Sequence, residues 1–167
     1  RAGTLLLAGN GADAVVVESG AALASRERGA AGWTAENGFL IDTNSGTGLL
    51  VVSNDLMQLG AAEGPGSVRI EDGAALHGEG TVALAAPGGI TVGDIDLSAK
   101  DLLLSLEDIN IGTDDALAEA EARSVLSDGW RLNQGILDGL LALGELESFS
   151  LQAAGAINFF GPVTLDT

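Results

Sequence analysis

The most regular part of the chain is residues 68–111, which read VRIEDGAALHGEGTVALAAPGGITVGDIDLSAKDLLLSLEDINI. Pairs of apolar residues separated by a single position recur there at offsets of 14, 13 and 14 residues: Val68 with Ile70, Val82 with Leu84, Ile95 with Leu97, and Ile109 with Ile111. Single apolar residues lie between these pairs, at Leu76, Ile90 and Leu103. Short strands with alternating inward and outward side chains are therefore predicted to begin about every seven residues.

Residues typical of turns separate the predicted strands, as in Glu71-Asp72-Gly73 and Pro87-Gly88-Gly89. A chain that turns after every strand of about three to five residues, and stacks every third strand on an earlier one, uses about 20 residues per turn. The pattern predicts an all-β fold, a parallel β-helix (solenoid) with a short α-helical insertion. A β-sandwich is the alternative, although sandwich strands usually run about five or six residues, with turn signals about every eight to twelve.

The rest of the chain departs from this spacing in two places. Residues 26–37 are predicted to form a loop insertion, and residues 114–143 a helical insertion with two short helices. Thr113 can cap the first helix and Asn133 the second. Around these insertions, residues 1–167 are expected to form a single β-helical module. Further strands are predicted at residues 4–7, 15–17, 22–23, 39–41, 49–52, 149–151, 157–159 and 163–165.

The composition excludes several classes of function. Seven basic residues against 24 acidic residues give a formal charge of −17, which excludes a surface for the phosphates of a nucleic acid. The chain has no Cys and a single His, which excludes thiol catalysis, zinc sites built with Cys and motifs that need two histidines. No apolar run reaches the length of a membrane span. Because the chain begins at Arg1, we expect it to be a fragment of a longer protein.

Two stretches resemble a known family of proteins. Residues 146–165 read LESFSLQAAGAINFFGPVTL. This run resembles a recurring segment of the filamentous haemagglutinin family of Gram-negative exoproteins, in which a strand, a turn of small residues, Ile-Asp/Asn-aromatic, a Gly and another strand follow one another. Residues 66–90 are also similar to the repeats of that family.

The resemblance implies a right-handed parallel β-helical segment of a large adhesin that is secreted or anchored at the cell surface. It implies export through an outer-membrane transporter by two-partner secretion, and the lack of Cys suits a chain that crosses the periplasm unfolded. The Asn-Pro-x-Gly motifs of the family's secretion domain are absent from this sequence. Because the family supplies no general catalytic residues, the resemblance implies a structural and adhesive module whose ligand on a host or neighbouring cell is unknown.

Acidic residues at the predicted corners are the candidates for metal binding. Asp94, Asp96 and Asp101 are close enough in sequence to form a weak calcium site outside the cell. Carboxylates exposed to water at the corners are the simpler interpretation of the same residues. We therefore predict no metal site and no cofactor.

A β-helical polysaccharide hydrolase or lyase is the alternative function. Asp94 with Glu107 or Asp108, on different turns, could supply the pair of carboxylates that glycoside hydrolysis needs. Such a cleft also needs aromatic residues and, for uronate substrates, basic residues, but Arg69 and Lys100 are the only basic residues in the repeating stretch. We therefore predict no catalytic residues and a protein that is not an enzyme.

Trp33 and Trp130 lie in the two stretches that interrupt the repeat, and they are the candidate ligand contacts because tryptophan is enriched in binding hot spots. The alternative is that each tryptophan anchors its own insertion to the rest of the fold. His77 is expected to be an exposed surface residue beside an inward-facing Leu76. Phe159 and Phe160 are expected to belong to the core.

Overall fold

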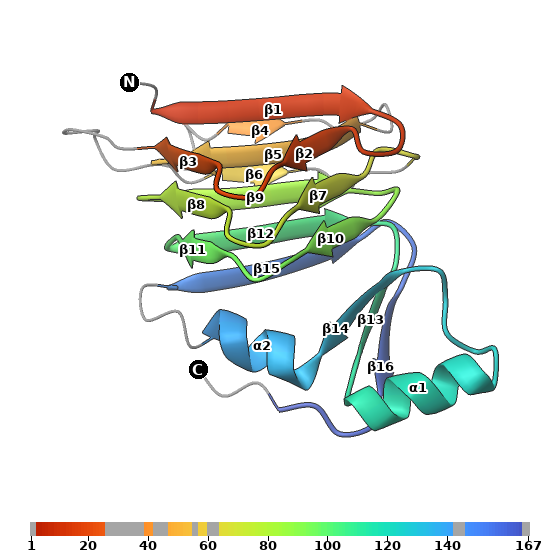
Figure 1. The fold of residues 1–167 in the computed structure, drawn as a ribbon. Coiled ribbons are helices and arrows are strands. Elements are labelled where there is room, and N and C mark those ends of the chain that lie inside the picture. The colour runs from red at the N-terminus through yellow and green to blue at the C-terminus, as the bar shows by residue number, and fades with distance from the viewer. Residues whose placement is uncertain are drawn as a thin grey trace.

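The computed structural model describes residues 3–25, 39–41, 47–54, 57–59, 64–141 and 146–164. The helices are α1 (Asp114–Ala122) and α2 (Gln134–Leu141). The strands are β1 (Thr4–Asn10), β2 (Val15–Val17), β3 (Ala22–Ser25), β4 (Phe39–Ile41), β5 (Thr47–Ser53), β6 (Met57–Leu59), β7 (Val68–Ile70), β8 (Ala75–Gly78), β9 (Thr81–Ala86), β10 (Ile90–Val92), β11 (Asp96–Ser98), β12 (Asp101–Leu106), β13 (Ile109–Gly112), β14 (Trp130–Asn133), β15 (Ser148–Ala153) and β16 (Ile157–Phe160). Figure 1 shows the strands stacked in layers, with β1 at one end and the two helices at the other.

The largest sheet has the strand order β1-β5-β9-β12-β15. Strand β5 runs antiparallel to both of its neighbours, β1 and β9. Strand β12 runs parallel to both of its neighbours, β9 and β15. The sheet is therefore mixed, with the change of direction at β5.

Three smaller sheets, each of three parallel strands, complete the layers. Their strand orders are β10-β7-β2, β11-β8-β3 and β14-β13-β16. Apolar residues in register face the same core from successive strands, as Leu23, Leu76 and Leu97 do in β3, β8 and β11. A fourth, two-stranded sheet pairs β4 with β6, behind the largest sheet in the view of Figure 1.

Strand β5 of the largest sheet is buried on both faces. Leu50 and Val52 of β5 belong to the main core, which the largest sheet shares with the smaller sheets in front of it. Leu49 and Val51 belong to a second apolar cluster that includes Met57 of β6. Because β5 has an apolar core on each side, its four consecutive residues 49–52 are all apolar.

The prediction of a right-handed parallel β-helix is wrong. The strands form several separate sheets rather than one closed coil, and the largest sheet contains two antiparallel pairs, β1 with β5 and β5 with β9. The cause lies in the N-terminal third of the chain, where β1 and β5 each have 7 residues and do not follow the spacing of residues 68–111. The regular spacing is found in the middle of the chain and does not extend to the N-terminal third.

The two predicted helices are present, and the predicted caps hold their first turns. The Thr113 hydroxyl accepts the N–H of Ala116 at 3.3 Å, and the Asn133 side-chain oxygen accepts the N–H of Ile136 at 2.8 Å. Strand β14, between the helices, is one that the sequence pattern did not indicate, and it pairs parallel with β13.

The predicted loop insertion at residues 26–37 lies outside the described residues. In the described part of the chain, no helix is long and apolar enough to cross a lipid bilayer.

Candidate functional site

The carboxylates at the corners hold successive layers together. Asp72, between β7 and β8, accepts the N–H of Asp94 in the next layer at 2.8 Å. Asp108, between β12 and β13, accepts the N–H of Ala156 at 2.7 Å. A Cβ atom at Gly93 would lie only 2.2 Å from Oδ1 of Asp72, so this close approach requires glycine. These acidic residues have a structural role in the turns.

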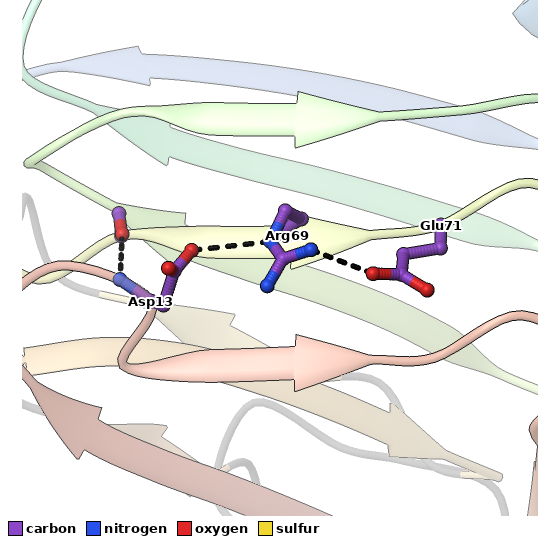
Figure 2. A network of polar contacts seen from close by, with 4 residues as sticks. Asp13, Arg69 and Glu71 are labelled. Atoms are coloured by element: carbon purple, nitrogen blue, oxygen red, sulfur yellow. Dashed lines mark hydrogen bonds and ion pairs between the residues drawn. The ribbon is translucent and has the colours of Figure 1, made fainter.

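Arg69 is paired with two carboxylates on the outer face of β7 (Figure 2). Its Nε lies 3.1 Å from Oδ1 of Asp13, and its Nη1 lies 2.6 Å from Oε1 of Glu71. The other oxygen of Glu71 accepts the N–H of Ser19 at 3.1 Å. Lys100 is paired as well, because its Nζ lies 2.9 Å from Oε1 of Glu147. Both basic residues of the repeating stretch are therefore already neutralised by acidic neighbours.

The three aspartates considered for calcium have different surroundings. Asp94 lies at the corner between β10 and β11, Asp96 begins β11, and Asp101 begins β12. Asp96 lies 3.5 Å from Nε2 of His77, whereas Asp101 is hydrogen-bonded to Ser148. Within the residues that the structure describes, no three His, Asp or Glu side chains gather into a group that could hold a metal ion.

Burial raises the pKa of Asp101, against the opposing effect of its hydrogen bond to Ser148; the negative charge of Glu147 adds to the rise. Because the folded pKa lies above the unfolded value of 3.8, the contribution of Asp101 to stability is fully present below that pH and is lost as the pH rises through the folded pKa. Asp101→Asn is therefore expected to raise the free energy of unfolding at neutral pH. The gain is expected to stay below about 1 kcal/mol, because the carboxylate is partly exposed to water.

Urea unfolding of both proteins at neutral pH and below pH 3.8 tests this expectation, since the gain should disappear in acid. Asp128→Asn, which removes the same charge from an exposed position, is the matched control. A loss of stability in Asp101→Asn at neutral pH would contradict the expected gain. It would mean that the hydrogen bond to Ser148 outweighs the cost of burying the carboxylate.

The carboxylates considered for glycoside hydrolysis lie at corners of different layers. The Asp108 carboxylate is occupied with the backbone of Ala156. Asp94 lies in a different layer, where its N–H is held by Asp72. The corner that carries Glu107 also binds the next layer through its backbone, because the Glu107 carbonyl accepts the N–H of Gly155 at 2.8 Å.

The burial of His77 and of the two phenylalanines agrees only in part with the predictions from the sequence. Leu76 is buried and His77 is half-buried, with Asp96 beside it as a neighbour that the sequence did not indicate. The prediction that Phe159 belongs to the core is wrong, because its side chain is 63% exposed. Phe159 is in register with Ile111 of β13, which is buried, so the exposure is confined to β16. Phe160, on the other face of the strand, is half-buried.

Trp33 lies outside the described residues, and Trp130 lies at the start of β14. Trp130 is half-buried and packs against the main core. It also lines a cavity of about 390 Å³, which we call the end cavity, between the main core and α2. The role of either tryptophan in ligand binding stays a prediction.

The end cavity has an apolar floor and walls. Its floor is formed by buried leucines of β8, β9 and β12, namely Leu76, Leu84, Leu102 and Leu104. Its walls include Ile90 of β10, Leu97 of β11 and Trp130 of β14, which are only partly buried. The main core is therefore open to this space at the end of the stack.

The more exposed residues around the end cavity come from β10, the following corner and α2. Val92 and Ile136 are 38% and 39% exposed, respectively. Among the described residues that line the cavity, Asp94 is the one ionisable residue, and it is exposed. The cavity thus combines an apolar interior with a single negative charge on its lining.

Comparison of the chain with protein-family models, with curated proteins and with solved structures gave no match, so the resemblance to filamentous haemagglutinin exoproteins stays a hypothesis based on its residues.

Proposed function

We propose that this chain is a non-catalytic structural and adhesive module of a larger bacterial exoprotein of the filamentous haemagglutinin type, secreted or anchored at the cell surface. The observation that carries the proposal is the use of the corner carboxylates. Asp72 and Asp108 each accept a backbone N–H of the neighbouring layer, and Glu71 binds both Arg69 and the backbone of Ser19. Side chains that hold layers together support a role in building a stable body that carries other segments.

The pairing of the two basic residues in the repeating stretch argues against a lyase or hydrolase acting on acidic polysaccharides. Such an enzyme needs free guanidinium or ammonium groups to bind the carboxylates of its substrate. Arg69 and Lys100 are each bound to acidic residues of this chain. The net charge of −17 also repels an anionic polymer.

The same charge suits a protein displayed at high density outside a cell, because like-charged copies repel one another. Export of the parent protein through an outer-membrane transporter of two-partner secretion is part of the proposal and depends on the resemblance of residues 66–90 and 146–165. The parallel β-helix is not part of it, since stacked mixed and parallel sheets can carry surface segments equally well.

The proposal is tested with the purified chain on two kinds of sample. A fluorescently labelled chain is applied to arrays of glycans, purified matrix proteins and fixed cells, and saturable binding to at least one surface is expected. The same chain is incubated with neutral and uronate polysaccharides, and no new reducing ends or unsaturated products are expected. Heat-unfolded chain is the control for binding that does not need the fold.

Two results would contradict this function. Polysaccharide turnover that disappears in Asp94→Ala or Glu107→Ala would show an enzyme. The absence of saturable binding to every surface tested, by a chain shown to be folded by circular dichroism, would remove the adhesive role.

A further inference from the structure

The end cavity arises where the smaller sheets stop and the largest sheet continues. Strands β10 and β11 are the last strands of their sheets, whereas the largest sheet adds β15 beyond β12. Helix α2 lies beyond β11 and β15 at this end of the stack (Figure 1). Leu137 of α2 inserts into the main core and is buried, but the neighbouring Ile136 is 39% exposed. Between α2 and the last strands of the stack, part of the volume is unfilled, and this is the end cavity.

Water is poorly accommodated in this space. A buried water needs about two to four polar partners, and an apolar cavity lacks them. Among the described residues that line the end cavity, all but Gly93 and Asp94 are apolar. The volume of about 390 Å³ falls in the range of about 300–1,000 Å³ that is usual for small-molecule sites. An apolar group that enters would replace badly bonded water and cover the partly buried Ile90 and Leu97.

Electrostatics select the kind of apolar ligand. Asp94 is an exposed acidic residue on the lining. Its backbone N–H is held by Asp72 and its carbonyl accepts the N–H of Gly73, so its carboxylate is the charged group at this corner. The whole chain carries a further excess of negative charge, −17 in total. A fatty-acid carboxylate would be repelled both by Asp94 and by the net charge of the chain, whereas a cationic head group would be attracted by both. The ring of Trp130 can add a cation–π contact.

We propose that the end cavity binds a cationic amphiphile, with its hydrocarbon chain against the core leucines and its ammonium group beside Asp94. Trp130 is then a ligand contact through its position in the cavity wall. This site shares Trp130 with the candidate ligand contacts considered for adhesion. The proposal rests on the lining of the end cavity and holds whether or not the chain is an adhesin.

The test uses three probes with one hydrocarbon chain and different head groups: decyltrimethylammonium, decanol and decanoate, each below the concentration at which it forms micelles. The full chain carries Trp33→Phe, so that Trp130 is the sole tryptophan and reports on the cavity. Saturable changes in Trp130 fluorescence and calorimetric heats give the dissociation constants. We expect the cationic probe to bind about three- to fivefold more tightly than decanol, and decanoate to bind more weakly than both.

A matched pair of charge variants locates the head group. Asp94→Asn should make the cationic probe and decanol bind equally, because it removes the carboxylate and keeps the side-chain shape. Glu18→Gln, which removes a carboxylate from the corresponding corner between β2 and β3, should leave the preference unchanged. Added salt should weaken the preference in the chain with Asp94 and have no effect in Asp94→Asn.

Two blocking variants locate the hydrocarbon chain. Ile136→Phe and Val92→Phe each place a larger side chain at a partly exposed position on the lining, and each should weaken all probes at least tenfold. Circular dichroism and urea unfolding show which of the two blocking variants are folded. One folded blocking variant is enough for the test. The proposal is overturned if no probe binds, if decanoate binds as tightly as the cationic probe, or if folded blocking variants bind as tightly as the parent chain.

Discussion

Val51→Asp is expected to unfold the protein or to lower its free energy of unfolding by about 4 kcal/mol or more. Val51 is 0% exposed in β5, and its side chain lies in the second apolar cluster behind the largest sheet. A carboxylate placed there loses its hydration and gains no cationic partner from that apolar cluster. Urea unfolding followed by circular dichroism measures the loss.

The neighbouring residue provides the decisive comparison. Val52→Asp should be as damaging as Val51→Asp, because Val52 faces the main core on the opposite side of the sheet. Leu6→Asp is the matched control, since Leu6 pairs with Val51 across β1 and β5 but is 47% exposed. Its cost should stay within about 1 kcal/mol. If one of the two valine positions tolerates aspartate, one side of β5 faces solvent and the largest sheet does not have a core on each face.

Local signals in the sequence predicted most strands and both helices. Residues 15–17 and 39–41 were predicted as strands, and they form β2 and β4. Thr113 followed by Asp114 and Asp115 predicted the start of α1, and the Thr113 cap is present. These features depend on side chains within a few residues of each other, so one stretch of sequence contains the whole cause.

Strand direction could not be predicted in the same way. Whether β5 runs parallel or antiparallel to β1 depends on the path of the chain between β3 and β5, and no short pattern records it. One signal was present: residues 49–52 are four consecutive apolar residues, which is typical of a strand buried on both faces. The regular spacing of residues 68–111 was instead extended to a part of the chain that does not share it.

The roles of the candidate site residues depend on contacts that are distant in sequence. The partner of the Asp108 carboxylate is the backbone of a residue 48 positions away. Trp130 lines the end cavity together with Ile136 of α2 and residues of β8 to β11, which are distant in sequence. Phe159 is exposed although it is in register with the buried Ile111 of β13, which depends on how far the packing extends over the sheet and not on the motif Ile-Asn-Phe-Phe. Residue types indicated the candidates, and only the fold shows their surroundings.

Asn110→Ala is expected to lower the free energy of unfolding by about 3 kcal/mol. Asn110 is fully buried in β13, the central strand of the sheet β14-β13-β16. Its Nδ2 donates to the carbonyl of Ser127 at 3.0 Å, and its Oδ1 accepts from the Ser127 hydroxyl at 3.0 Å and from Nδ2 of Asn158 at 3.1 Å. Each of these hydrogen bonds contributes about 1 kcal/mol, and removing Asn110 also leaves partners unsatisfied.

Asn158→Ala is the matched variant, because it removes the same kind of side chain from the edge strand β16 and leaves both Ser127 bonds of Asn110 in place. It removes the bond from Nδ2 of Asn158 to Asn110 and a longer one, of 3.3 Å, to the Ser127 hydroxyl. Its cost should be about 1–2 kcal/mol, and a double-mutant cycle should give a coupling of about 1 kcal/mol between the two asparagines. Costs that simply add would show that the bond between Asn110 and Asn158 contributes nothing. The stability of this sheet would then depend on the apolar residues Ile109, Ile111 and Leu132, which are buried on its core side.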